Sequence, residues 1–376
     1  MDLKEVREYF PHINKGITYL NHAATGPLSQ KVLEVMNEFF LSKSEESIDD
    51  YTGFVKITDE TKEIIASLLN ADIKRIAFGD NTTNGMNLIA QGLKWNKGDE
   101  IILNDIEFPA NVYPFLNLRK QGVNVIFVKS HDGVVSAEDI IERMTKNTRL
   151  VSVSMVQFLS GYRIDLGLLG EICSQNNIYL SVDAIQGLGA LNLDVQKNKI
   201  DFMSCGTQKW LLALQGLAIY YFSDKLFDTL EPAYVGWLGV KNAWEMLDYK
   251  LILKNSAERF QPGTISTVGV FALNAALKLF RDFGFKEVEE RVISNSEFLL
   301  NELQKLNIKP YLRKLDKRYL SGIVSFKHPE AWSILEILKD RKIEAAVREG
   351  TVRISPHFYN NEDDFAKLLC AFRSLN

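Results

Sequence analysis

Two side chains of opposite charge follow neighbouring predicted strands, and their types suit imine chemistry. Asp183 closes the apolar run 178–183, and Lys209 follows a strand predicted over 201–205 after a short turn. A lysine that is removed from water has a lowered pKa, and its neutral amine forms an imine with an aldehyde. A carboxylate at the same sheet edge can keep a bound pyridine nitrogen protonated, so that the ring accepts electrons from a substrate carbanion.

A third feature is suited to binding an anion. The segment 79–85, Gly-Asp-Asn-Thr-Thr-Asn-Gly, lies between a predicted strand and a predicted amphipathic helix over 86–93. A helix N-terminus there would offer free N–H groups together with the hydroxyls of Thr82 and Thr83. Taken singly, the acid and the threonines are explained by helix capping and the lysine by a solvated surface. Together the three features predict pyridoxal phosphate (PLP), which has an aldehyde, a pyridine nitrogen and a phosphate.

The elements that must position these side chains alternate between strand and helix from about residue 60 to residue 225. This alternation predicts an α/β fold with a largely parallel, doubly wound sheet, in which ligands bind beyond the carboxyl ends of the strands. The predicted strands cover 75–79, 100–103, 124–128, 150–154, 178–183, 201–205 and 218–222.

The pattern changes after residue 222. Residues 231–263 predict an ordered loop region, and a long helix follows over 268–283. The rest predicts a smaller α+β unit, with helices over 286–305, 330–341 and 361–372 and strands over 322–326 and 351–354. We therefore expect a large PLP-binding domain over 16–264 and a small C-terminal domain over 265–376, with residues 1–15 packing on the small domain.

Composition excludes several other classes of protein. Of the 376 residues, 46% are hydrophobic and 24% are charged, and the formal net charge of -4 argues against nucleic-acid or polybasic membrane binding. The charged N-terminus predicts no secretory signal, and the longest apolar run is too short to span a bilayer. The three cysteines have neither disulfide nor metal-ligand spacing. We expect a cytoplasmic protein without a metal site.

The chain resembles the class V aminotransferase family, the PLP fold-type I branch that includes cysteine desulfurases, kynureninase and isopenicillin-N-epimerase-like proteins. The resemblance extends from the segment 19–24 to the segment 352–356. Its most specific stretches are 181–186, 204–211 and 259–264. It implies a fold-type I large domain, an amino acid or amine substrate, and a homodimer whose active sites are shared between subunits.

The resemblance also implies roles for individual residues around the cofactor. Lys209 is implied as the Schiff-base lysine, Asp183 as the partner of the pyridine nitrogen, and Gln186 as a neighbour of the cofactor's 3′ oxygen. Phe108 falls where many relatives stack a histidine on the ring, and a phenylalanine there can stack but cannot transfer protons. The phosphate is expected to contact Thr82, Thr83, Gln208 and, from the neighbouring subunit, Thr264.

For the substrate, the resemblance implies that Arg353 clamps the carboxylate, which a planar guanidinium can bind through two parallel hydrogen bonds. Arg348 is a second candidate, and His22 is expected in the substrate-binding set. The asparagine that many relatives place against the cofactor is missing from the segment 157–160, where Gln157 is the available amide.

One departure from the family bears on the reaction. Cysteine desulfurases carry a catalytic cysteine on a loop just upstream of the arginine that matches Arg353, whereas here residues 347–352 connect directly. Cys205 belongs to the strand before the lysine, and Cys173 and Cys370 are predicted on the apolar faces of helices, where cysteine acts as a small hydrophobe. The sequence therefore disfavours sulfur transfer through an enzyme persulfide.

We expect a PLP enzyme acting on an amino acid or amine, with transamination slightly ahead of carbon–sulfur or carbon–carbon lysis and of epimerisation, which share its early steps. A non-catalytic PLP-binding protein is an alternative of another class. The presence of Lys209, Asp183 and Arg353 together argues against it. A dehydrogenase is disfavoured because no G-x-G-x-x-G motif follows the early strands.

Overall fold

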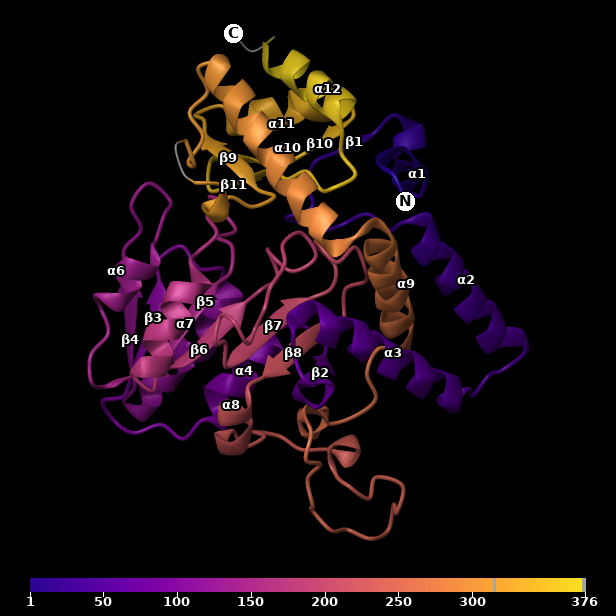
Figure 1. The fold of residues 1–376 in the computed structure, drawn as a ribbon, viewed down its shortest axis with the longest axis vertical. Coiled ribbons are helices and arrows are strands. Elements are labelled where there is room, and N and C mark those ends of the chain that lie inside the picture. The colour runs from indigo at the N-terminus through magenta and orange to yellow at the C-terminus, as the bar shows by residue number, and fades with distance from the viewer. Residues whose placement is uncertain (314–315, 374–376) are drawn as a thin grey trace.

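The computed structural model describes residues 1–313 and 316–373. Its main body is a seven-stranded sheet with the strand order β2-β8-β7-β6-β5-β3-β4 (Figure 1). Only β8 runs antiparallel to its neighbours, so the sheet is mostly parallel, as predicted. The strands are β2 (Ile76–Gly79), β3 (Glu100–Asn104), β4 (Asn124–Val128), β5 (Thr148–Ser154), β6 (Tyr179–Asp183), β7 (Phe202–Gly206) and β8 (Ala218–Phe222).

Alternate residues of the strands face two hydrophobic cores, which makes the sheet doubly wound. In β6, Leu180 and Val182 lie in the same core as side chains of α7 (Leu166–Gln175). Tyr179 of the same strand lies in the other core, with side chains of α4 (Thr82–Gly92). Because successive side chains of a strand point to opposite faces, each layer of helices covers its own apolar face of the sheet.

The predicted helix over 86–93 begins earlier than expected. The helix α4 starts at Thr82, because the side chain of Asn81 caps it by accepting a hydrogen bond from the N–H of Asn84 at 2.9 Å. The other helices of this part of the chain are α2 (Gln30–Glu45), α3 (Tyr51–Leu69), α5 (Tyr113–Leu116), α6 (Ala137–Ile141), α8 (Asp224–Thr229) and α9 (Thr267–Phe283). Short 3₁₀ helices cover Ile13–Lys15, Ile73–Arg75, Pro109–Asn111, Asn117–Gln121, Trp237–Gly239, Ala257–Phe260 and Lys317–Tyr319.

The C-terminal part forms a smaller α+β unit, orange to yellow at the top of Figure 1. An antiparallel sheet in the order β11-β12-β9 packs with three helices, and two very short strands, β1 and β10, pair in parallel. The elements are α10 (Phe285–Lys305), β9 (Val324–Lys327), α11 (Ala331–Asp340), β10 (Ile343–Glu344), β11 (Ala346–Arg348), β12 (Thr351–Ile354) and α12 (Glu362–Arg373), with β1 (Thr18–Tyr19) from the N-terminal segment.

Residues near the N-terminus contact this unit. In α1 (Leu3–Glu8), Arg7 forms an ion pair with Asp364 at 2.8 Å, and the ring of Phe10 stacks on Tyr359 with centroids 3.8 Å apart. The domain boundary predicted at residue 264 stays a prediction. Among the described residues, no helix has the length and apolar character needed to cross a membrane.

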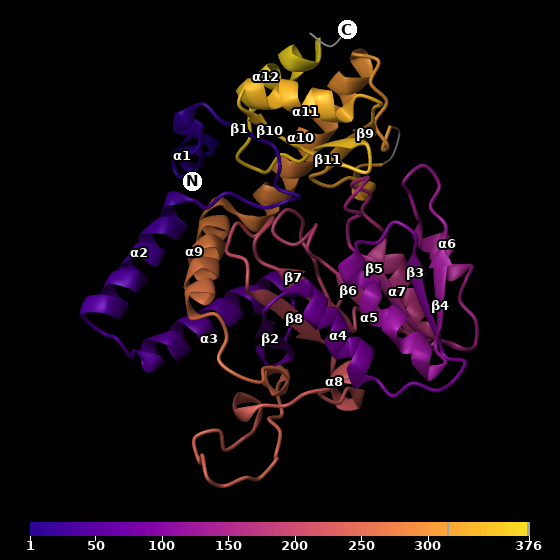
Figure 2. The same ribbon diagram turned by 180° about the vertical axis from the view of Figure 1, so that it is seen from behind.

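The loop between α8 and α9 projects from the body, at the bottom of Figures 1 and 2. It exposes many large apolar side chains, which is unusual for a surface in water. They are Tyr234, Val235, Trp237, Trp244, Met246, Leu247, Tyr249, Leu251 and Ile252. Together with α2 and α3, this loop lines an open groove whose apolar walls have no covering segment within the described residues.

Candidate active site

The structure brings Asp183 and Lys209 to one edge of the sheet. Asp183 is the last residue of β6 and pairs with Ser204 of the adjacent parallel strand β7, and Lys209 follows the end of β7. The carboxylate of Asp183 is buried. One oxygen accepts a hydrogen bond from the N–H of Ile185 at 3.0 Å, and the other, Oδ2, has no donor among the described residues.

The electrostatics of this pair follow from burial. Burial raises the pKa of Asp183, and the nearby Glu107 adds to the rise. Burial lowers the pKa of Lys209 from 10.5 to about 8, partly opposed by the carboxylate of Asp183 and reinforced by the charge of Arg353. A larger fraction of the Lys209 amine is therefore neutral near neutral pH than in an exposed lysine, as imine formation requires.

These residues fit the predicted cofactor. The unpaired Oδ2 of Asp183 would accept a hydrogen bond from a protonated pyridine nitrogen, and the Lys209 amine would hold the aldehyde carbon. The Nζ atom of Lys209 lies 5.6 Å from the ring centroid of Phe108, whose edge contacts the ring of Phe158. Phe108 is 44% exposed, which leaves its face free to stack on a bound ring.

The N-terminus of α4 lies beside the same edge. Thr82 is buried, and its hydroxyl accepts a hydrogen bond from the N–H of Gly206 at the end of β7 at 3.0 Å. Thr83 is exposed. Capping by Asn81 leaves the first two N–H groups of the helix without partners in the described chain, so this end of α4 is suited to a phosphate. The phosphate contacts of both threonines stay predictions.

Hydrogen bonds hold the residues before and after Lys209 in its turn. The carbonyl of Gln208 accepts hydrogen bonds from the N–H of Gly26 at 2.7 Å and from the hydroxyl of Thr25 at 3.2 Å. The indole N–H of Trp210 donates to Gln186 at 2.9 Å. These contacts hold the backbone on either side of the lysine and so fix the position from which its side chain departs.

Two predicted site residues make buried contacts of their own. The amide of Gln186 donates to the carbonyl of Ala23 at 3.0 Å and accepts from Trp210, so both of its polar atoms have protein partners. His22 is fully buried, with one ring nitrogen donating to the carbonyl of Ser355 and the other accepting from the hydroxyl of Tyr359. Neither contact involves a ligand, and the ligand-binding roles of Gln186 and His22 stay predictions.

Arg353 reaches the site from the small unit. It lies on β12, is 2% exposed, and donates from Nη1 to the carbonyl of Phe158 at 3.0 Å. Its Nε is buried without an acceptor, and no described acidic side chain forms an ion pair with it. Burial, together with the nearby charge of Arg348, lowers its pKa to about 10. A guanidinium with an unused edge suits the carboxylate of a ligand.

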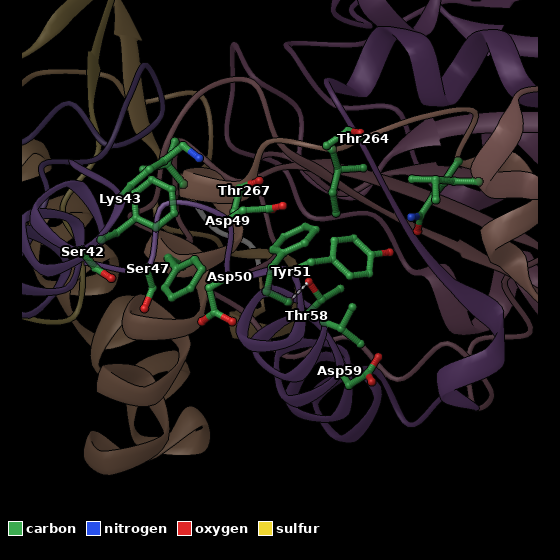
Figure 3. A pocket seen from close by; sticks show the side chains of 18 of the residues that line it. Ser42, Lys43, Ser47, Asp49, Asp50, Tyr51, Thr58, Asp59, Thr264 and Thr267 are labelled. Atoms are coloured by element: carbon green, nitrogen blue, oxygen red, sulfur yellow. Dashed lines mark hydrogen bonds between the residues drawn. The ribbon is translucent and has the colours of Figure 1, made fainter. Parts of the chain in front are cut away.

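The structure does not bring Thr264 together with Lys209 in one chain. Thr264 is exposed and lines the groove formed by α2, α3 and the projecting loop. Figure 3 shows Thr264 and Thr267 with Tyr51 and Thr58 of α3 around this groove. Its predicted contact with the cofactor of a neighbouring subunit stays a prediction.

The sequence analysis assigned no role to Glu107, which lies three residues beyond β3 at the centre of a buried hydrogen-bond network. Its carboxylate accepts from Asn104 at 2.6 Å, from Asn111 and Gln157 at 3.1 Å each, and from both the N–H and the hydroxyl of Ser154. Since Gln157 donates through Nε2, its Oε1 is left as a buried acceptor without a donor. The sequence signal that could have identified Glu107 is the position of its carboxylate just beyond the end of a predicted strand.

Neither buried cysteine offers a thiol suited to sulfur transfer. Cys173 and Cys205 are buried, and burial raises the pKa of the Cys173 thiol to about 12 and that of Cys205 further above its ordinary value. The prediction that Cys370 lies on the apolar face of its helix is wrong, because Cys370 is exposed. Cys370 belongs to α12, at the top of the small unit in Figure 1. This helix buries other residues, among them Leu369 and Ala371, and leaves Cys370 on its exposed side.

Comparisons with known proteins extend over nearly the whole chain. Residues 18–368 match the family model described as Aminotransferase class-V. A probable cysteine desulfurase of Pyrococcus abyssi is 27% identical over 99% of this chain and 97% of that protein. The uncharacterized aminotransferase YcbU of Bacillus subtilis is 25% identical over 96% of this chain and 95% of that protein.

Solved structures show the same architecture. The apo cysteine desulfurase from Thermococcus onnurineus superposes with a TM-score of 0.89 at 25% identity, covering 99% of this chain and 97% of that one. The cystine C–S lyase C-DES, in complex with its reaction product cysteine persulfide, superposes with a TM-score of 0.88 at 23% identity. That match covers 96% of this chain and 98% of the lyase, and at this identity it shows the fold alone.

We expect covalent capture of PLP by the apoprotein to follow the titration of Lys209. Only the neutral amine attacks an aldehyde, and burial lowers the pKa of Lys209 to about 8. The rate measured from the visible band should therefore rise with pH and level off above about 8, well below the value for a free lysine of about 10.4. Borohydride reduction and peptide mapping should place the cofactor on Lys209.

The matched control is Asp183→Asn. Because the carboxylate of Asp183 raises the pKa of Lys209, its removal should move the midpoint of this pH profile downward. A profile that still rises above about pH 10, or a label on another lysine, would contradict the assignment.

Proposed function

The chain belongs to the class V aminotransferase family, and on this premise we propose that it is a PLP-dependent lyase that breaks a carbon–sulfur bond of an amino acid without an enzyme thiol. Pyridoxal phosphate is its cofactor. The observation that carries the proposal is the placement of Lys209, Asp183 and Arg353 around one site, with a two-residue turn where desulfurases carry their cysteine loop. The curated relatives named cysteine desulfurase support the reaction class.

Each of these residues has a distinct task in the proposed reaction. Bound PLP supplies an electron sink that acidifies the α-proton of the substrate. Asp183 holds the proton on the ring nitrogen, and Arg353 holds the substrate carboxylate so that the Cα–H bond is oriented toward Lys209. Lys209 accepts the α-proton on its neutral amine. Phe108 covers one side of the ring and excludes water there.

The sulfur departs without help from a protein thiol. The electron pair of the carbon–sulfur bond leaves with the sulfur atom, as a thiolate or a persulfide, and the remaining three-carbon enamine hydrolyses to a 2-oxo acid and ammonia. Near the site, Phe108 cannot donate a proton and Cys205 is buried with a raised pKa. A sulfur leaving group of low pKa suits such a site, because it needs no general acid.

Transamination, the reaction that the sequence analysis placed first, is the second candidate. One observation favours it: the pKa of Lys209 is lowered to about 8, so its amine can both accept and return a proton, and transamination requires no further proton donor. The relative named as the aminotransferase YcbU agrees with this reading. A non-catalytic PLP-binding role is disfavoured, because it leaves the buried unpaired Nε of Arg353 without a use.

The two reactions differ in their products, and the test uses the holoenzyme with cystine or S-substituted cysteines. We expect a 2-oxo acid and ammonia in equal amounts without any added 2-oxo acid. A variant with Cys173, Cys205 and Cys370 all changed to Ser or Ala should keep most of this activity, because no thiol takes part. Turnover that depends on an added 2-oxo acid, without ammonia release, would support transamination instead. A labelled persulfide on one cysteine, with activity lost when that cysteine alone is replaced, would overturn the thiol-free mechanism.

Replacing the partner of the ring nitrogen should affect turnover more than folding. In Asp183→Ala the ring loses a charge-assisted hydrogen bond, so we expect turnover to fall about ten- to a hundredfold or more. Circular dichroism and the thermal midpoint should show a folded protein, because the change removes an unpaired buried oxygen. Nearly normal turnover would remove Asp183 from the mechanism.

We further propose a homodimer with shared sites. The groove that contains Thr264 has exposed aromatic walls, including Tyr51, Trp237 and Trp244, and a second copy of the chain is the occupant that the family resemblance implies. A dimer would cover this apolar surface and bring Thr264 toward a neighbouring cofactor.

Light scattering of the wild type at micromolar concentration should give the mass of a dimer. In the projecting loop Leu247 is 84% and Tyr249 is 88% exposed, so changing both to Glu should yield a folded monomer with weakened PLP binding. The control Trp332→Glu, at an exposed position on α11 far from the loop, should remain dimeric. A wild-type monomer that binds PLP tightly would contradict the proposal.

A further inference from the structure

Two arginines share one face of the small sheet. In the pairing of β11 with β12, Ala346 lies opposite Arg353 and Arg348 lies opposite Thr351. Since side chains alternate along a strand and opposed residues share a face, Arg348 projects from the same face as Arg353. The two are diagonal neighbours, which lie about 7–8 Å apart in such a pair, within reach of long side chains.

The turn between these strands fixes Arg348 in place. Only Glu349 and Gly350 separate it from Thr351, and both have positive φ angles of 48° and 69°. This is the pattern of a type I′ turn, whose twist matches the flanking strands. Arg348 is therefore the last residue of a paired strand, and its position is set by the sheet.

Neither arginine is neutralised by the protein. No ion pair joins either one to an acidic side chain in the parts of the chain that the structure describes. Arg348 is exposed, and its Nη1 donates to the carbonyl of Val347 at 2.8 Å, which leaves its other donors free. Its charge lowers the pKa of Arg353 and that of Lys209, so the three cations lie near one another.

One carboxylate does not account for both cations. The free edge of Arg353 offers the two parallel donors that a single carboxylate takes. Arg348 is the diagonal neighbour of Arg353 on the same face of the sheet, and it is exposed to solvent. An α-carboxylate bound at Arg353 would leave the positive charge of Arg348 without an anionic partner.

From this arrangement we infer that the substrate carries a second anionic group at the end of its side chain, a carboxylate or a sulfonate, and that Arg348 binds it. The inference rests on the proposed function and adds to it the chemical class of the substrate. Arg348 is then a residue that determines specificity, whereas Arg353 serves every amino acid that enters.

The test measures binding without turnover, using amino acids that lack an α-proton. 2-Methylaspartate carries a second carboxylate and 2-aminoisobutyrate does not, and their binding to the holoenzyme is followed by the visible band and by calorimetry. We expect the wild type to prefer 2-methylaspartate by about tenfold or more, and Arg348→Gln to lose most of that preference. Arg353→Gln should weaken the binding of both ligands.

Lys327→Gln is the matched control. Lys327 is an exposed cation opposite Thr351 on the same face of the sheet, on β9 rather than on the strand that carries Arg348. This variant should keep the wild-type preference. Competition by succinate and by 3-sulfopropionate against 2-methylaspartate then separates a carboxylate from a sulfonate as the favoured group.

Equal binding of the two ligands by the wild type, or a preference that survives in Arg348→Gln, would overturn the inference. The inference about Arg348 and the proposed lyase activity can be rejected independently of each other. A strong preference without carbon–sulfur cleavage would leave the inference standing and reject the lyase. Cleavage of substrates with uncharged side chains, with no preference for a second anion, would do the reverse.

Discussion

A carboxylate oxygen without a hydrogen-bond donor, deep at the end of β6, is the constraint on which the rest of the site depends. A buried and unpaired polar atom costs about 1–3 kcal/mol, and the cost is greater for a charged group. Oδ2 of Asp183 is such an atom, and the charge of this carboxylate raises the pKa of the nearby Lys209. The protonated pyridine nitrogen of a bound cofactor would supply the missing donor. Cofactor binding through Asp183 would then stabilise the folded protein as well as enable the chemistry.

Lys209 and Arg353 lie on two segments that a hydrogen bond joins. Trp210, directly after Lys209, receives a hydrogen bond at its carbonyl from Nε2 of His357 at 2.9 Å. Nδ1 of that ring accepts from the N–H of Phe358, so the histidine is neutral and its tautomer is set. His357 follows the strand that carries Arg353. The small unit is therefore bonded directly to the turn that carries Lys209, which fixes the position of β12 relative to that turn.

The hairpin at residues 348–351 links two properties of the site. Its two-residue turn leaves no segment that could bring a thiol toward the substrate, and it places Arg348 beside Arg353. Gly350, with φ of 69°, meets the backbone requirement of the turn at little cost. In this family the electron sink and base are common to several reactions. A change confined to one short connection can therefore alter both the fate of the sulfur and the choice of substrate.

The sequence by itself determined the sheet and the central pair. All seven strands were predicted, with the bounds of β4 and β8 correct, because a buried strand shows as a short apolar run between turns. Asp183 and Lys209 could be placed together because the carboxyl ends of neighbouring parallel strands meet at one edge. The tertiary structure alone decided the network of Glu107, the exposure of Cys370 and the pairing that sets Arg348 on the face of Arg353. Each of these depends on contacts between segments far apart in the chain, or on strands too short to show a periodic pattern, and local residue types carry no record of such contacts.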